Sequence, residues 1–179
     1  MKVVGFVGSS GSGKTTMIEQ VVQRLSECGL RVAVLKHAHQ GFDMDRPGKD
    51  SYRAREAGAT QVLVASRDRW VLLSEQPSPL EEPSLEMMLA RFDANALDLV
   101  LVEGFSHAHY PKIEVYRAAN GKPPRCWPHD PDLIALVTDA PLDGGAVPRL
   151  ALNAPLEVTR FVLEFLALPA SHRSRGEAA

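Results

Sequence analysis

The sequence is poor in cysteine and in net charge. Its two cysteines, Cys28 and Cys126, lie far apart in 179 residues, which argues against a disulfide framework or a zinc knuckle and favours a reducing, cytoplasmic compartment. The formal charge is −2 and the pI is 6.3, so the whole chain has no net attraction for nucleic acid or an anionic membrane. Any polyanionic ligand must therefore be held by a local site.

Long hydrophobic runs are also absent. The N-terminal segment has one lysine and a short apolar stretch that breaks into glycines, which is too short for a signal peptide or a membrane span. Hydrophobic residues make up 45% and charged residues 23%, values typical of a soluble globular protein. At about 150 residues for each domain, we expect one nucleotide-binding domain over residues 1–168 and a disordered tail over 169–179.

Strands and helices alternate along the chain. Residues 2–7 and 31–36 each contain a short apolar run, and the segment 14–28 between them has apolar residues at helical spacing, which predicts a right-handed βαβ unit. The same patterns predict strands at 97–102, 112–116, 133–137 and 149–152, helices at 50–57, 84–92 and 155–166, and a hairpin of 60–66 with 69–74. Asn153 is the predicted cap of the last helix. The predicted fold is α/β: a P-loop NTPase, with a mostly parallel sheet flanked by helices and a β-hairpin addition.

A glycine-rich loop follows the first predicted strand and opens the first predicted helix. It matches G-x-x-x-x-G-K-[ST] in full, and its residues are Gly8, Ser9, Ser10, Gly11, Ser12, Gly13, Lys14 and Thr15, followed by Thr16. In this context the backbone N–H groups and the helix N-terminus surround a phosphate, the lysine reaches the β and γ phosphates, and the threonine hydroxyl binds Mg²⁺. The motif therefore predicts nucleoside triphosphate binding.

An acidic residue at the end of a second parallel strand would complete the Mg²⁺ site. Glu103 ends the apolar run Leu99–Val102 and precedes Gly104, which is the usual position of such an acid. Asp98 is the rival, but it begins the strand and should lie at the opposite edge of the sheet. An ordinary solvated carboxylate at position 103 is the alternative.

Four histidines form two His-x-His pairs just beyond predicted strands. They are His37 with His39 and His107 with His109. With Asp43 and Asp45 nearby, a transition-metal site is conceivable, but the spacing matches no known zinc pattern. Loop histidines that line a polar cleft are the favoured interpretation, and the two aspartates are better candidates for outer-sphere contacts with Mg²⁺.

Asp139 ends a late apolar strand that runs from Leu133 to Thr138. One carboxylate can accept hydrogen bonds from both N1–H and the N2 amino group of guanine, so Asp139 is a candidate for base recognition. A surface carboxylate at a strand end is an equally good interpretation of this residue.

Together these segments resemble a known family. GSSGSGKTT, LKHAHQGFDMDRPGKDSYRAREAGA (residues 35–59), DLVLVEGF (98–105) and PKIEVYR (111–117) occur in this order, and the combination resembles the molybdopterin-guanine dinucleotide biosynthesis protein B family, MobB. The phosphate loop is shared by many families, whereas the block from His-Ala-His to Gly-Lys-Asp-Ser is far more specific.

The resemblance implies a GTP-binding homodimer that assists the guanylyltransferase of molybdenum cofactor synthesis, with molybdopterin or apo-molybdoenzymes as further candidate partners. Carried over by position, residues 8–16 would hold the phosphates, Thr15 and Glu103 the Mg²⁺, and Asp139 the guanine. No residue clearly matches a water-positioning glutamine or an arginine finger, so we expect weak, Mg²⁺-dependent GTPase activity. The exposed hairpin at 60–74 is a candidate dimer element.

A small-molecule kinase is the alternative function, because GSSGSGKTT also occurs in metabolite kinases. Such an enzyme needs an acceptor pocket and usually a lid that carries arginine. The lid-like segment of this chain, residues 118–131, offers Lys122 and Arg125.

Overall fold

The protein is described here from a computed structural model, which covers residues 1–38, 41–75 and 82–168. The chain divides into two compact units: one comprises Met1–His37 and the chain from Ser84 onward, and the other comprises Ala38–Pro83. The tail predicted at residues 169–179 lies outside the described residues, as does His39.

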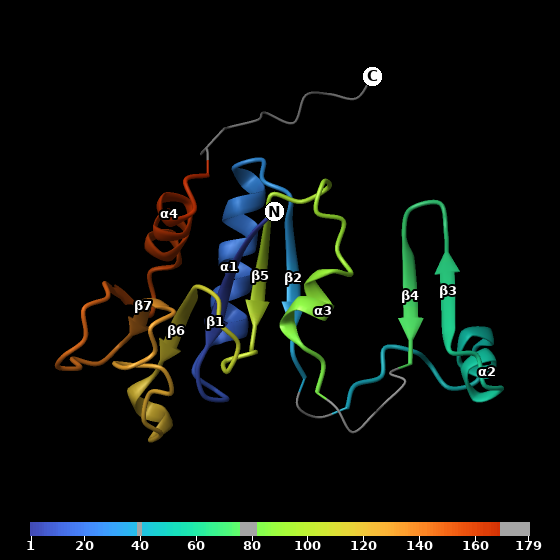
Figure 1. Cartoon of the computed structure of the whole chain (residues 1–179), viewed down its shortest axis with the longest axis horizontal. Helices are drawn as coiled ribbons and strands as arrows, with labels where there is room; N and C mark the ends of the chain where they lie inside the picture. The colour runs from blue at the N-terminus through green and yellow to red at the C-terminus, as the bar shows by residue number, and fades with distance from the viewer. Residues whose placement is uncertain (39–40, 76–81, 169–179) are drawn as a thin grey trace. The chain divides into compact units, whose positions relative to one another are not determined.

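The first unit contains a six-stranded sheet in the order β2-β5-β1-β6-β7-β8, and every pairing in it is parallel (Figure 1). The strands are β1 (Lys2–Val7), β2 (Val32–Lys36), β5 (Leu99–Glu103), β6 (Lys112–Tyr116), β7 (Leu133–Thr138) and β8 (Arg149–Ala151). Because the strands are parallel, their carboxyl ends share one edge, and the phosphate loop, Glu103 and Asp139 all follow or end strands at that edge. The predicted fold class is confirmed, with all strands of this sheet parallel.

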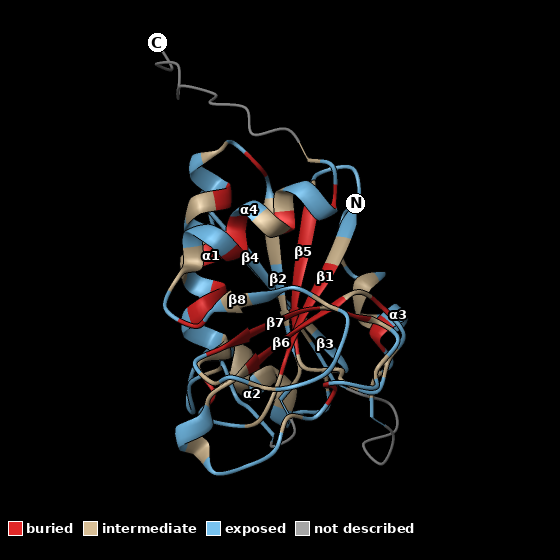
Figure 2. Ribbon diagram, turned by 90° about the vertical axis from the view of Figure 1, so that its left-hand side faces the viewer, coloured by how far each residue is buried: buried red, intermediate tan, exposed pale blue. Residues whose placement is uncertain are grey.

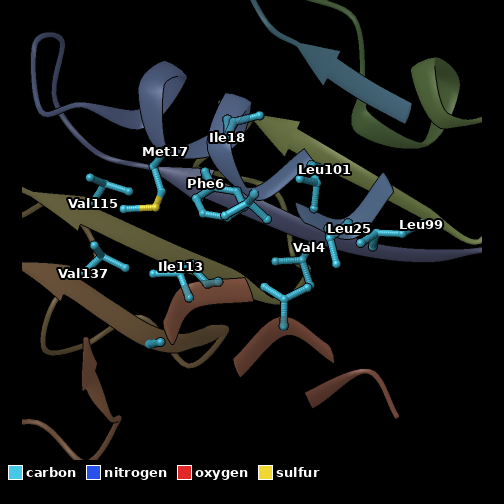
Figure 3. Packing of buried hydrophobic residues seen from close by; sticks show 14 of the residues in the cluster. Val4, Phe6, Met17, Ile18, Leu25, Leu99, Leu101, Ile113, Val115 and Val137 are labelled. Carbon is cyan, nitrogen blue, oxygen red and sulfur yellow. The ribbon is translucent and has the colours of Figure 1, made fainter. Parts of the chain in front are cut away.

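Helices α1 (Lys14–Glu27) and α4 (Pro155–Phe165) cover one face of the sheet. Alternate residues of β1, among them Val4 and Phe6, point to this face and pack with Met17 and Leu25 of α1 (Figure 3). All four side chains are at most 4% exposed. This packing follows from the two-residue period of strands meeting the apolar stripe of an amphipathic helix.

The opposite face packs against α3 (Leu85–Leu89) and the segment after β5. Val100 and Val102, the other alternate residues of β5, contact Leu85 and Tyr110 there. A Cβ on Gly5 would lie 2.3 Å from the Tyr110 ring, so only glycine fits at this point of β1. The central strands are buried on both faces, as the red ribbon of Figure 2 shows, which explains why their sequences are continuously apolar.

The second unit holds α2 (Asp50–Glu56) and a two-stranded antiparallel sheet of β3 (Gln61–Ala65) and β4 (Trp70–Ser74). The predicted hairpin is thus confirmed as a separate sheet. Leu63 pairs with Leu72 across it, and Trp70 is 71% exposed. Arg55 of α2 forms ion pairs with Asp43, Asp45 and Glu75, which lie before the helix and at the end of the hairpin.

Two details of the helices differ from the sequence expectations. Helix α3 ends at Leu89 rather than at residue 92, and turns follow it. The prediction of Asn153 as the cap of α4 is wrong: Ala154 is the N-cap residue and makes no side-chain cap, while Pro155 begins the helix, a position that suits the fixed φ of proline. In the described part of the chain, no helix is long and apolar enough to cross a membrane.

Candidate functional site

The phosphate loop connects β1 to α1 at the carboxyl edge of the sheet. Gly8, Gly11 and Gly13 have φ values of 136°, 79° and 99°, which L side chains rarely adopt. A Cβ on Gly8 would also lie 2.3 Å from the Val115 carbonyl oxygen of β6. Gly13 is the N-cap residue of α1 and offers no side-chain cap, so the N–H groups at this helix start are not bound by a capping side chain. The geometry fits a phosphate.

Lys14 is folded back onto the loop that precedes it. Its Nζ donates a hydrogen bond to the Ser9 carbonyl oxygen at 2.8 Å. Burial lowers the pKa of Lys14; the Glu103 carboxylate raises it, and the positive charges of Arg125 and Lys36 lower it further. A bound anion would stabilise the charged form of Lys14, because it offsets the repulsion from the neighbouring cations.

Thr15 and Glu103 meet, although 88 residues separate them in sequence. The Thr15 Oγ1 donates to the Glu103 carboxylate, at 3.0 Å from Oε1 and 3.1 Å from Oε2. Glu103 is the last residue of β5, and its side chain is only 12% exposed. Hydroxyl and carboxylate oxygens are the hard ligands that Mg²⁺ prefers, so the two side chains fit a Mg²⁺ ion beside the phosphates.

Lys36 joins the same group from β2. Its Nζ lies 3.3 Å from the Glu103 Oε1 and 3.5 Å from the Thr15 Oγ1. Asp98, the rival acid, lies at the other end of β5 and pairs with Arg31 at 2.8 Å. The sequence expectation that Asp98 belongs to the opposite edge is confirmed.

A short helical turn, η1 (Ala118–Asn120), follows β6 and contacts the phosphate loop. The Asn120 Nδ2 donates to the Ser10 carbonyl oxygen at 3.1 Å. The turn is held in place by Asp139, whose Oδ1 accepts the Ala118 N–H at 2.9 Å. Asp139 therefore supports the loop through this turn, and it is exposed at the end of β7, where a base could reach it.

The lid-like segment after η1 is tied to the sheet by a buried carboxylate. Glu114, in the middle of β6, is 1% exposed. Its Oε2 accepts the N–H groups of Cys126 at 3.0 Å and Trp127 at 2.8 Å, and its Oε1 accepts the N–H of Arg125. Three backbone donors on one carboxylate hold this part of the segment in place. If the segment were a kinase lid, it would have to move.

A cavity of about 500 Å³ lies beside this segment and is lined in part by Arg125, His107, His109 and Lys112. His109 bonds to Asp132 at 2.9 Å and Lys112 to Asp130 at 2.8 Å. His37 stacks on Phe105, with ring centroids 4.6 Å apart. Within residues 1–38, 41–75 and 82–168, no group of three or more His, Cys, Asp or Glu side chains is arranged to hold a metal ion.

Sequence reasoning missed several residues at the loop. Lys36 reaches the loop from β2, Arg117 from just after β6, and Asn120 from η1. Arg125 was noted only as part of a lid. The available signal was positional, since polar residues that end the strands on either side of β1 must share its carboxyl edge. Using that signal requires the strand order, which local patterns do not supply.

A family model described as MobB, Molybdopterin guanine dinucleotide synthesis protein B, matches residues 3–139 of the chain. The chain is 40% identical over 164 residues to the molybdopterin-guanine dinucleotide biosynthesis adapter protein of Escherichia coli K12, covering 92% of this chain and 93% of that protein. It is 37% identical over 167 residues to the adapter protein of Haemophilus influenzae, covering 93% and 83%.

Solved structures agree with the sequence comparisons. The fold matches the crystal structure of Bacillus subtilis MobB with a TM-score of 0.72 and 26% identity, covering 92% of this chain and 97% of that one. It matches the crystal structure of a MobB homologue from Bacillus stearothermophilus with a TM-score of 0.69 and 26% identity, covering 93% and 99%.

Proposed function

Because the chain belongs to the MobB family of molybdopterin guanine dinucleotide synthesis proteins, we propose that it is an adapter protein of this biosynthesis that binds GTP and Mg²⁺ at residues 8–16. The observation that carries the nucleotide site is the contact of the Thr15 hydroxyl with both oxygens of Glu103 at 3.0 and 3.1 Å. It brings the phosphate loop and the acidic strand end together, as Mg²⁺-nucleotide binding requires.

The proposed chemistry is binding with slow hydrolysis. The residues at the loop that the structure describes include cations and the Glu103 carboxylate, but no glutamine side chain is among the contacts of the site. Positioning of water is worth orders of magnitude in phosphoryl transfer, so GTP turnover by the isolated protein is expected to be slow. We place the protein in the cytoplasm, where nucleotide is available.

A binding titration of GTP and ATP tests the site directly. Wild-type protein is expected to bind GTP more tightly than ATP in the presence of Mg²⁺, and Lys14→Ala is expected to abolish binding while the circular dichroism spectrum stays unchanged. Lys122→Ala is the matched control, because Lys122 is an exposed lysine that takes part in no described contact of the loop. Unchanged GTP affinity in Lys14→Ala would refute the assignment of this loop.

We further propose that the second unit forms a homodimer contact. A two-stranded hairpin is only marginally stable alone in water, yet β3 and β4 expose Leu63 at 63%, Leu72 at 45% and Trp70 at 71%. Such exposed apolar side chains on an unpaired sheet are typical of a surface that a second strand pair covers. A second copy of this chain is the occupant that the family resemblance favours.

The proposed partner is the guanylyltransferase that attaches GMP to molybdopterin. Support comes from the names of the relatives, which call them adapter proteins. The segment at residues 125–127 is anchored to Glu114 and so is unlike a moving kinase lid, which argues against the kinase alternative. Co-purification of the tagged guanylyltransferase with this protein, in GTP and without nucleotide, tests the interaction. Phosphate transfer to a metabolite in a panel assay would instead support the kinase alternative.

A further inference from the structure

Arg117 lies directly beside the phosphate loop. It follows β6, which pairs with β1, and its Nη2 is 3.4 Å from the position that a Cβ on Gly13 would occupy. The side chain is half-buried. Among the described residues it has no carboxylate partner. The guanidinium therefore faces the last glycine of the loop, where α1 begins.

Arg125 approaches from the segment that Glu114 anchors. The hydrogen bond from its backbone N–H to the Glu114 Oε1 fixes the Arg125 backbone against β6. Glu114 pairs with Val7, the residue directly before the phosphate loop, so the anchor of Arg125 lies next to the loop. The Arg125 side chain is exposed, and its charge is close enough to Lys14 to lower the pKa of that amine. Arg125 also makes no ion pair with a carboxylate in the part of the chain that the structure describes.

Some cations in other parts of the described chain do have carboxylate partners. Away from the loop, Arg31 pairs with Asp98 at 2.8 Å, Arg55 with Glu75 at 2.8 Å, and Lys112 with Asp130 at 2.8 Å. Around the loop, Lys36 pairs with Glu103 at 3.3 Å and Lys14 lies close enough to feel its charge, whereas Arg117 and Arg125 make no ion pair with a described carboxylate. Guanidinium groups bind phosphate through two parallel N–H bonds, so a bound polyphosphate would supply the missing counter-charge.

We infer that Arg117 and Arg125 are nucleotide-binding residues with separate roles, Arg117 on the phosphate held by the loop and Arg125 on the terminal phosphate beside Lys14. The division follows from position, because Arg117 faces Gly13 within the loop, whereas Arg125 lies near the lysine that reaches the outer phosphates. Arg125 then makes the site selective for nucleoside triphosphates over diphosphates. This inference rests on the proposed function, since it assigns residues of the same nucleotide site.

The test compares the dissociation constants of GTP and GDP, measured with Mg²⁺ by isothermal titration calorimetry. Removing one charge-assisted contact weakens binding by about tenfold or more. Arg125→Ala is expected to weaken GTP by that factor and GDP by less than about threefold. Arg117→Ala is expected to weaken both nucleotides alike. Arg117→Lys and Arg125→Lys, which keep the charge but lose the paired N–H donors, should recover part of the loss.

Lys122→Ala removes a cation from the same segment and is expected to bind both nucleotides like the wild type. Thermal unfolding of each variant by circular dichroism checks that it is folded, and the lysine variants replace any alanine variant that is not. GTP and GDP affinities within twofold of the wild type in both arginine variants, with Lys14→Ala inactive, would overturn this inference alone. Absence of nucleotide binding by the wild type would overturn it together with the proposed function.

Discussion

Glu114→Gln is the substitution whose effect on stability can be worked out in most detail. The glutamine has the shape of glutamate, so it leaves no cavity, but it has one acceptor oxygen in place of two. That oxygen is best placed where Oε2 accepts from Cys126 and Trp127. The amide nitrogen then faces the Arg125 N–H, whose bond to Oε1 is lost.

The magnitude follows from the number and type of bonds. Losing one hydrogen bond to a charged group costs about 1.5–3 kcal/mol, and changing two others from charged to neutral acceptors costs about 1 kcal/mol each. Burying a neutral amide instead of a carboxylate returns part of this cost. The expected net decrease in the free energy of unfolding is about 2–4 kcal/mol, or roughly 5–15 °C in Tm for a chain of this size.

The assay is urea denaturation followed by circular dichroism, with Glu164→Gln as the control. Glu164 is exposed on α4, and its substitution is expected to change stability by at most about 0.5 kcal/mol. Glu114→Ala should cost more than Glu114→Gln, because it leaves all three N–H groups without an acceptor. A stability for Glu114→Gln equal to or above that of the wild type would refute the reasoning, since it would mean that the cost of burying the charge exceeds the gain from its hydrogen bonds.

Four further outcomes are expected. Thr15→Ala should weaken GTP binding when Mg²⁺ is present and leave it unchanged in chelator; equal weakening in both would assign the hydroxyl another role. Asp139→Asn keeps an acceptor for the Ala118 N–H but loses the carboxylate, so the preference for GTP over ATP should fall by about tenfold in the same titration, and an unchanged ratio would exclude base recognition. Leu72→Lys should convert a dimer to a monomer in light scattering, whereas an unchanged mass would place the dimer contact elsewhere. Burial raises the pKa of the Cys126 thiol to about 12, so at pH 8 about one thiol in ten thousand is ionised, and a thiol reagent should label Cys126 only after unfolding; rapid labelling of the native protein at Cys126 would contradict its burial.

The parts of the fold that were predictable are those encoded by short-range patterns. Residues 3–7 and 99–102 are apolar because both faces of their strands are buried, and the helix 14–27 carries its apolar stripe in sequence. The phosphate loop was predictable because its glycines adopt φ values that its sequence pattern implies. Glu103 was predictable from its place at the end of an apolar strand.

What the sequence did not indicate depends on which strands are neighbours. Glu114 is a carboxylate within an apolar strand, and nothing local says that residues 125–127 supply its three N–H donors. Arg117 reaches Gly13 only because β6 pairs with β1. Spacing in sequence alone could not have shown this proximity, because it depends on long-range strand pairing.

The charge of the chain gives the strongest argument for how a slightly acidic protein holds a polyanion. Two buried or anchoring cations of the fold are neutralised by carboxylates, Arg31 by Asp98 and Lys112 by Asp130. At the loop, Arg117 and Arg125 make no ion pair with a described carboxylate, and Glu103, already bonded to Thr15 and Lys36, is the acid best placed to meet a divalent ion. A total charge of −2 is therefore compatible with a local excess of positive charge at the loop. Since that excess is partly exposed, raising the salt concentration should weaken GTP binding by the wild type more than by Arg125→Ala, and equal salt dependence would show that Arg125 does not contact the phosphates.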